Sequence, residues 1–152
     1  MTSSCVLLYA SMSGNTMRMA NMIAEGVAQA GCDLVVKEMY TASALELEAY
    51  DCILLGSSTW GDGELPDEAL DFYEEMDQLN LHGKTAAVFG SGDSSYEHYG
   101  AAVDLLEHKL WELGADLVLG SFKVEHSPTR DEFEDCRLFG KAFVEQSSYY
   151  EK

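Results

Sequence analysis

The segment SMSGNT, residues 11–16, directly follows an apolar run and is rich in hydroxyl and amide side chains. Backbone N–H groups at a helix start are unpaired and carry a partial charge of roughly +0.5. A strand, a turn of this composition and a helix start can therefore form a pocket for a phosphate group. The segment contains no Lys or Arg and fits neither GK[ST] nor GxGxxG. Ser, Thr and Asn also cap ordinary helices, so both interpretations stay open at this point. The residues concerned are Ser11, Met12, Ser13, Gly14, Asn15 and Thr16.

Two later segments could hold a planar ring. The first, STWGDG at residues 58–63, places Trp60 beside glycine, and the second, GSGDSSYEHYG at residues 90–100, contains Tyr96. A tryptophan and a tyrosine at one edge can enclose a flat ring, and such aromatic contacts add about 0.5–1.5 kcal/mol each beyond area burial. Asp93 could accept a hydrogen bond from a ring N–H. Packing of Trp60 back onto the following helix is the alternative.

The elements that must position these segments alternate between short apolar runs and amphipathic stretches, which predicts an α/β fold with a doubly wound parallel sheet. Right-handed crossovers favour the strand order 2-1-3-4-5. All three segments then leave the sheet at the carboxyl ends of its strands, where ligands bind in such folds. The five predicted strands are Cys5–Ala10, Asp33–Met39, Asp51–Gly56, Thr85–Gly90 and Asp116–Val124. The first predicted helix has its apolar face at Met17, Ala20, Ile23, Ala24 and Val27.

Composition and charge limit the function classes. A chain of 152 residues predicts a single domain over residues 1–152, and a net charge of −18 argues against nucleic acid or an anionic membrane as partner. No apolar run reaches the ~20 residues of a membrane span, no signal segment is recognisable, and the four cysteines lack metal-ligand spacing, which together predict a cytoplasmic protein without a metal site. Many carboxylates occur within residues 62–77. They form either a solvated face or, as we favour, a docking surface.

Together, the three segments resemble those of the flavodoxin family, and the strand and helix order agrees along the whole chain. The continuous fifth strand, without a ~20-residue insertion, resembles the short-chain class. The resemblance implies FMN as cofactor, with its phosphate on SMSGNT and Ser58, its flavin between Trp60 and Tyr96, and its pyrimidine edge at Asp93. Ser13 stands where many members have Thr. The cofactor-binding residues that the resemblance implies are Ser11, Met12, Ser13, Gly14, Asn15, Thr16, Ser58, Thr59, Trp60, Gly61, Asp62, Gly63, Ser91, Gly92, Asp93, Tyr96, His98 and Gly100.

The resemblance also implies a low-potential one-electron carrier, cycling between flavin semiquinone and hydroquinone, with no substrate chemistry of its own. The Gly61–Asp62 peptide would tune the potentials, and His98 is either a pH-sensitive tuner or merely exposed. The expected partners are basic-surfaced redox proteins, namely an NAD(P)H-dependent flavodoxin or ferredoxin reductase and acceptor enzymes. The protein itself is expected to be a monomer.

Three alternatives remain to be weighed. An FMN-dependent two-electron oxidoreductase of the quinone reductase type shares these loops, as does a specialised flavodoxin-like activator of ribonucleotide reductase. A phosphoryl-accepting receiver domain is close to excluded, because it needs an acidic pair after its first strand, where this chain has Ala10 and Ser11.

Overall fold

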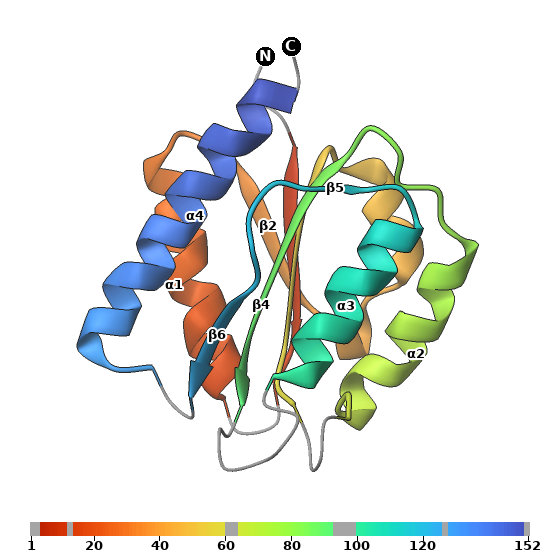
Figure 1. The fold of residues 1–152 in the computed structure, drawn as a ribbon, viewed down its shortest axis with the longest axis horizontal. Helices are drawn as coiled ribbons and strands as arrows, with labels where there is room; N and C mark the ends of the chain where they lie inside the picture. The colour runs from red at the N-terminus through yellow and green to blue at the C-terminus, as the bar shows by residue number, and fades with distance from the viewer. Residues whose placement is uncertain (1–3, 12–13, 60–63, 93–99, 126–127, 151–152) are drawn as a thin grey trace.

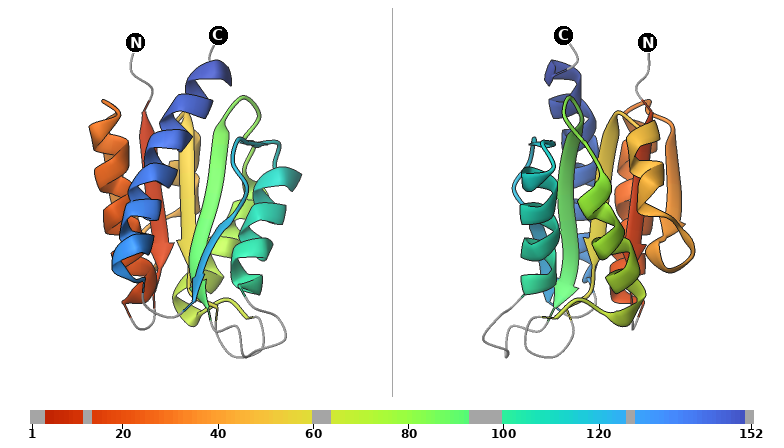
Figure 2. Two further views of the ribbon diagram at one scale, coloured as in Figure 1. Left: turned by 60° about the vertical axis from the view of Figure 1, so that its left-hand side comes forward. Right: turned by 90° about the vertical axis from the view of Figure 1, so that its right-hand side faces the viewer.

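The protein, here a computed structural model, has three layers, with a central sheet covered by helices on both faces (Figures 1 and 2). The structure describes residues 4–11, 14–59, 64–92, 100–125 and 128–150, except the side chains of 149 and 150. Helices α1 (Asn15–Gln29) and α4 (Arg130–Tyr150) lie on one face. Helices α2 (Asp67–Glu75) and α3 (Ala101–Glu112) lie on the other.

The sheet confirms the predicted α/β fold and strand order. The strands run in the order β2-β1-β3-β4-β5, and every pair is parallel. A further short strand, β6, also pairs with β4. The strands are β1 (Cys5–Ala10), β2 (Leu34–Glu38), β3 (Cys52–Ser57), β4 (Thr85–Gly92), β5 (Asp116–Leu117) and β6 (Phe122–Glu125).

The prediction of one continuous strand over Asp116–Val124 is wrong, because the ladder breaks in the middle. Ala86 of β4 is opposite Leu117, and Phe89 of β4 is opposite Phe122. Two residues of β4 therefore face the four residues 118–121, and the surplus of two residues loops out, as in the special bulges that contain more than one extra residue. The strand is thus divided into β5 and β6.

Burial of both sheet faces accounts for the nearly continuous apolar strands. All six residues of β1 and all six of β3 are buried. Along β1, Val6 and Leu8 join the core beneath α2 and α3, whereas Leu7 and Tyr9 join the core beneath α1 and α4. This alternation is the period of two expected of a strand.

The predicted buried face of α1 is partly wrong. Met17 is 38% exposed, whereas Met19 is fully buried. Ala20, Ile23 and Val27 are buried as predicted, so the true face is shifted around the helix to one side. With this orientation, α1 packs against α4.

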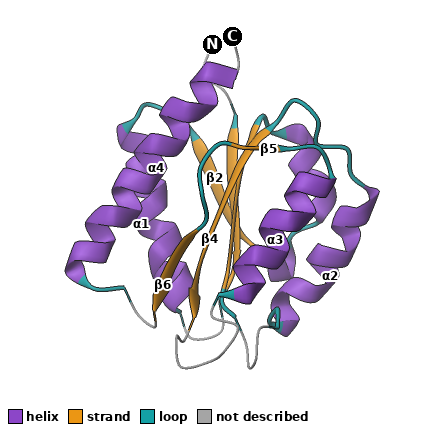
Figure 3. Cartoon of the chain, in the orientation of Figure 1, coloured by secondary structure: helices purple, strands orange, loops and turns teal. Residues whose placement is uncertain are grey.

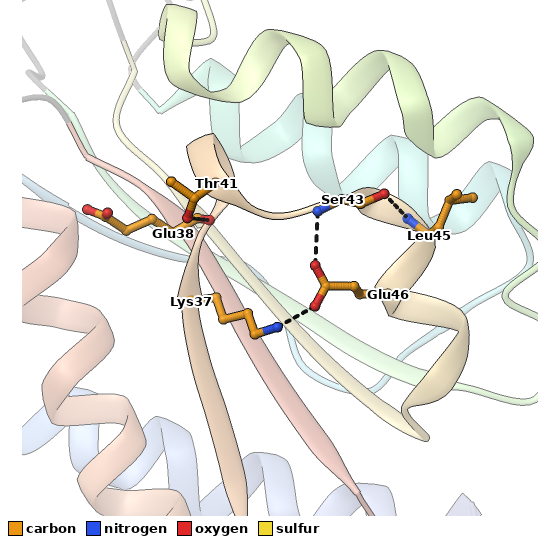
Figure 4. Close-up of polar contacts among 6 residues, drawn as sticks. All are labelled: Lys37, Glu38, Thr41, Ser43, Leu45 and Glu46. Carbon is orange, nitrogen blue, oxygen red and sulfur yellow. Dashed lines mark hydrogen bonds and ion pairs between the residues drawn. The ribbon is translucent and has the colours of Figure 1, made fainter.

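The segment between β2 and β3 forms two short 3₁₀ helices, η1 (Met39–Thr41) and η2 (Ala44–Ala49). Figure 4 shows how η2 begins. The Ser43 hydroxyl accepts from the Leu45 N–H at 3.2 Å, and the Glu46 carboxylate accepts from the Ser43 N–H at 3.0 Å, a reciprocal cap. Glu46 also pairs with Lys37 of β2, which fastens η2 to the sheet edge. A third 3₁₀ helix, η3 (Met76–Gln78), follows α2.

The carboxyl ends of the strands lie together at the lower side of Figure 3, where α1 and α3 also begin. This side is called the carboxyl edge below. In the part of the chain that the structure describes, no helix combines the length and apolar character needed to cross a bilayer.

Candidate functional site

Helix α1 begins at the carboxyl edge without a side-chain cap of its own. Its N-cap residue, Gly14, has φ of +87°, a left-handed conformation that glycine adopts without strain. The Ser11 hydroxyl replaces the missing cap by accepting from the N–H groups of Gly14 at 3.0 Å and Met17 at 3.3 Å. The turn after β1 therefore directs the first amides of α1 toward the carboxyl edge.

A buried hydroxyl cluster, Thr16–Ser58–Ser91, joins the end of the first loop to the starts of the second and third loops. Thr16 Oγ1 lies 2.9 Å from Ser58 Oγ and 2.8 Å from Ser91 Oγ, and Thr16 is fully buried. A hydroxyl has one proton, so Thr16 donates at most one of these hydrogen bonds and accepts the other from a serine. Residues far apart in sequence thus meet between β1, β3 and β4, where the strand order reverses.

Thr59 links the second loop to the third. Its N–H donates to the Ser91 carbonyl at 3.1 Å, and its Oγ1 accepts from the Ala102 N–H at 3.2 Å. The N-cap of α3 is Gly100, in a left-handed conformation and without a capping side chain. The Thr59 hydroxyl therefore caps α3 from another loop, whereas α1 is capped by Ser11 from the turn directly before it.

Two residues that the sequence analysis did not single out belong to this region. Gly90 lies so close to β3 that an added Cβ would be 2.1 Å from the Ser57 carbonyl oxygen. Arg18 donates from Nη1 to Asn15 Oδ1 at 2.9 Å. The spacing of three residues on a helix was a readable signal for this second contact.

The structure brings together many of the predicted site residues. Those within the described residues are Ser11, Gly14, Asn15, Thr16, Ser58, Thr59, Ser91, Gly92 and Gly100. The predicted residues that lie outside the described ones are Met12, Ser13, Trp60, Gly61, Asp62, Gly63, Asp93, Tyr96 and His98. Their roles stay predictions.

The donor set fits a phosphate group. At the start of α1, the described groups are helix amides, the hydroxyl of Ser11, the amide of Asn15 and the guanidinium of Arg18. A phosphate monoester carries about −1.5 to −2 charges and accepts strongly from such donors.

The acidic run at residues 64–77 lies along α2 and η3, and some of its carboxylates already have partners. Asp77 pairs with Lys109 of α3, and Glu75 accepts from the Ser43 hydroxyl at 3.3 Å. Others are exposed, among them Glu64, Asp67, Asp71 and Glu74. Some carboxylates of the run therefore stabilise the fold through their partners, and others form an exposed acidic surface.

The four cysteines are buried core residues. Cys5 begins β1, and its Sγ lies 2.9 Å from Cys32 Sγ. A hydrogen bond with Cys52 and burial raise the pKa of the Cys5 thiol well above its ordinary value. In α4, burial and the nearby carboxylates raise the pKa of Cys136 to about 12. These thiols are therefore protonated packing groups.

Comparison with known proteins agrees with this geometry. The family model described as flavodoxin matches residues 7–140. Probable flavodoxin 2 of Bacillus subtilis is 45% identical over 93% of this chain and 95% of its own length, and the flavodoxin of Maridesulfovibrio salexigens is 37% identical over 86% and 91%. The crystal structure of oxidised flavodoxin 1 from Bacillus cereus superposes with a TM-score of 0.91, at 49% identity over 94% of this chain and 98% of that one. The chain therefore belongs to the flavodoxin family, whose members bind FMN and transfer electrons without substrate chemistry of their own.

Proposed function

We propose that the protein binds FMN at the carboxyl edge and passes single electrons at low potential between a reductase and acceptor enzymes. The observation that carries this proposal is the Thr16–Ser58–Ser91 cluster, which ties one end of each of the three loops to a single point. Bound FMN supplies one-electron redox chemistry, and the chain supplies binding, orientation and exclusion of water.

The phosphate end of the site is built on regular elements. Ser11 and the cluster hold the start of α1 in place, so its amides need little reorganisation to receive an anion. Ser58 and Asn15 add side-chain donors beside them. Hydrogen bonds to a charged group contribute about 1.5–3 kcal/mol each, which lets an acidic chain hold a dianion with few cations.

The ring end is formed by the loops that Thr59 ties together. We assign one flavin face to Trp60, the other to Tyr96, and the pyrimidine edge to Asp93, following the sequence. The Gly61–Asp62 peptide is assigned to redox tuning. Thr59 supports these roles because it directly precedes Trp60 and is hydrogen-bonded to Ser91 and Ala102, which lie at the two stems of the loop containing Tyr96.

We propose that the protein is a cytoplasmic monomer and that its partners are basic-surfaced redox proteins. The exposed carboxylates of α2 would attract such partners at long range, and this attraction falls with ionic strength. Association with a basic NAD(P)H-dependent flavodoxin or ferredoxin reductase should therefore weaken as salt is raised from ~50 to ~500 mM. Salt-independent association would contradict the docking role.

The phosphate assignment is tested by titrating the apoprotein with FMN and with riboflavin, which lacks the phosphate. Asn15→Ala removes a side-chain donor and should weaken FMN binding by about 10-fold or more, and riboflavin binding by much less. Thr16→Val also breaks the contacts to Ser58 and Ser91, so it should weaken the binding of both ligands. Equal affinity of the wild-type protein for both ligands would refute the phosphate site.

The one-electron role is tested by stepwise anaerobic reduction followed by visible absorbance. Two separate one-electron steps support the carrier. A single two-electron step would instead support the alternative, an enzyme of the quinone reductase type. The family match does not favour that alternative.

A further inference from the structure

Arg18 lies over the last turn of the phosphate loop. Its Nη1 donates to Asn15 Oδ1 at 2.9 Å, and its backbone N–H donates to the Gly14 carbonyl at 3.0 Å. A Cβ built on Gly14 would be 3.8 Å from Nη1 and 3.9 Å from Nη2 of Arg18. The guanidinium therefore covers the residue from which α1 starts.

This contact fixes which way the Asn15 amide faces. Arg has only donors, so the Asn15 atom that meets it must be the carbonyl oxygen, and the NH₂ group must point away. Asn15 is the first residue of α1, where the unpaired backbone N–H groups also emerge. Arg18 thus leaves the Asn15 NH₂ available as a donor beside those amides.

Among the described residues, Arg18 forms no ion pair with a carboxylate, and in this it resembles Lys84, which donates to the backbone carbonyls of Glu48 and Tyr50, and differs from four other cations. Lys37, Lys109, Lys123 and Arg137 each form an ion pair with a carboxylate. The partner that the structure gives the Arg18 side chain is a neutral amide. Its positive charge therefore remains to act on an anion bound nearby.

We propose that Arg18 is a specificity-determining residue that makes this site prefer phosphorylated over unphosphorylated flavin. It orients the Asn15 NH₂ as a phosphate donor and adds a positive charge beside the start of α1. This inference deepens the proposed function and rests on its phosphate assignment.

The test measures dissociation constants of the apoprotein for FMN and riboflavin by quenching of flavin fluorescence. Arg18→Met keeps the aliphatic stem and should weaken FMN binding about 10-fold while changing riboflavin binding less than about 2-fold. Arg18→Lys keeps the charge but not the planar fork, and should weaken FMN binding by an intermediate factor. Lys109→Met is the matched control: it also removes one cation, but from near the end of α3, and it should leave the FMN-to-riboflavin preference unchanged.

A double-mutant cycle with Asn15→Ala separates the orienting role from charge alone. The loss of FMN affinity caused by Arg18→Met should be smaller in the Asn15→Ala background, because the donor that Arg18 orients is already absent. Equal losses in both backgrounds would overturn the orienting role.

The remaining outcomes are equally decisive. Parallel weakening of FMN and riboflavin by Arg18→Met would mean that Arg18 only supports the helix, and no change in either would mean that it plays no part. Either result overturns the proposal for Arg18. The phosphate site itself is still upheld if the wild-type protein prefers FMN over riboflavin. Absence of that preference in the wild-type protein would instead refute the proposed function itself.

Discussion

Replacing Thr59 by Val should loosen the ring end of the site while leaving the phosphate end intact. The change removes the hydroxyl that accepts from the Ala102 N–H at 3.2 Å, and it keeps the branched shape of the side chain. Because Gly100 supplies no cap, α3 then begins without a side-chain acceptor. Loss of such a cap costs about 1 kcal/mol, or about 2–4 °C in the melting temperature of a domain this size.

The same change should reach ligand binding through the two loops. Ligand binding must restore the start of α3 to its place, so the cost of about 1 kcal/mol is subtracted from the binding free energy, up to about fivefold in affinity. FMN and riboflavin should lose affinity by the same factor, since the phosphate end is untouched.

The assay combines thermal unfolding of the apoprotein with flavin titration, and Thr59→Ser is the matched control. Serine keeps the hydroxyl, so it should retain most of the melting temperature and the affinity. The reasoning is refuted if Thr59→Ser lowers the melting temperature and the flavin affinity as much as Thr59→Val does. It is also refuted if Thr59→Val weakens the binding of FMN but not that of riboflavin.

Two further predictions concern the core. The free energy of unfolding should fall as the pH rises from about 9 toward 12: the Cys136 thiol titrates near its ordinary value of 9.0 when unfolded, but folding raises its pKa to about 12, so the unfolded chain loses its proton first. Urea unfolding across this range should show a shallower decline for Cys136→Ala, and identical slopes would contradict the assignment. Gly26→Ala should destabilise the protein by about 1–3 kcal/mol, because the new Cβ would lie 2.0 Å from the Arg137 carbonyl oxygen where α1 meets α4. Gly120→Ala, with no neighbour within 4 Å, is its control, and equal unfolding midpoints for the two variants would refute the packing argument.

The sequence was sufficient for the strand order, because buried parallel strands and helical stretches leave few right-handed topologies. It was not sufficient for the division into β5 and β6. The apolar pattern continues across Val118 and Leu119, and the surplus of residues appears only when the chain is counted against its partner β4. Register is a property of two strands, and a pattern along one of them does not contain it.

The site shows a similar limit. The hydroxyls of Thr16, Ser58 and Ser91 were recognisable as donors, but their hydrogen bonds to one another were not, because they join residues 42 and 75 positions apart. The misplaced face of α1 has a local cause. Methionines stand at both 17 and 19, and the period alone does not say which of them turns toward the sheet.

The division between a phosphate end and a ring end has a thermodynamic consequence for electron transfer. A reduction potential changes only when a residue binds the oxidised and reduced cofactor with different free energies. The cofactor's phosphate does not take part in the electron transfer, so donors such as Ser11 and Asn15 stabilise both forms alike and cancel from the difference. Substitutions at Ser11 or Asn15 should therefore change affinity far more than potential. Substitutions at Thr59, which positions the loops assigned to the ring, should change both. The proposed site therefore predicts that the rigid elements retain the cofactor, while the loops that they hold set its redox properties.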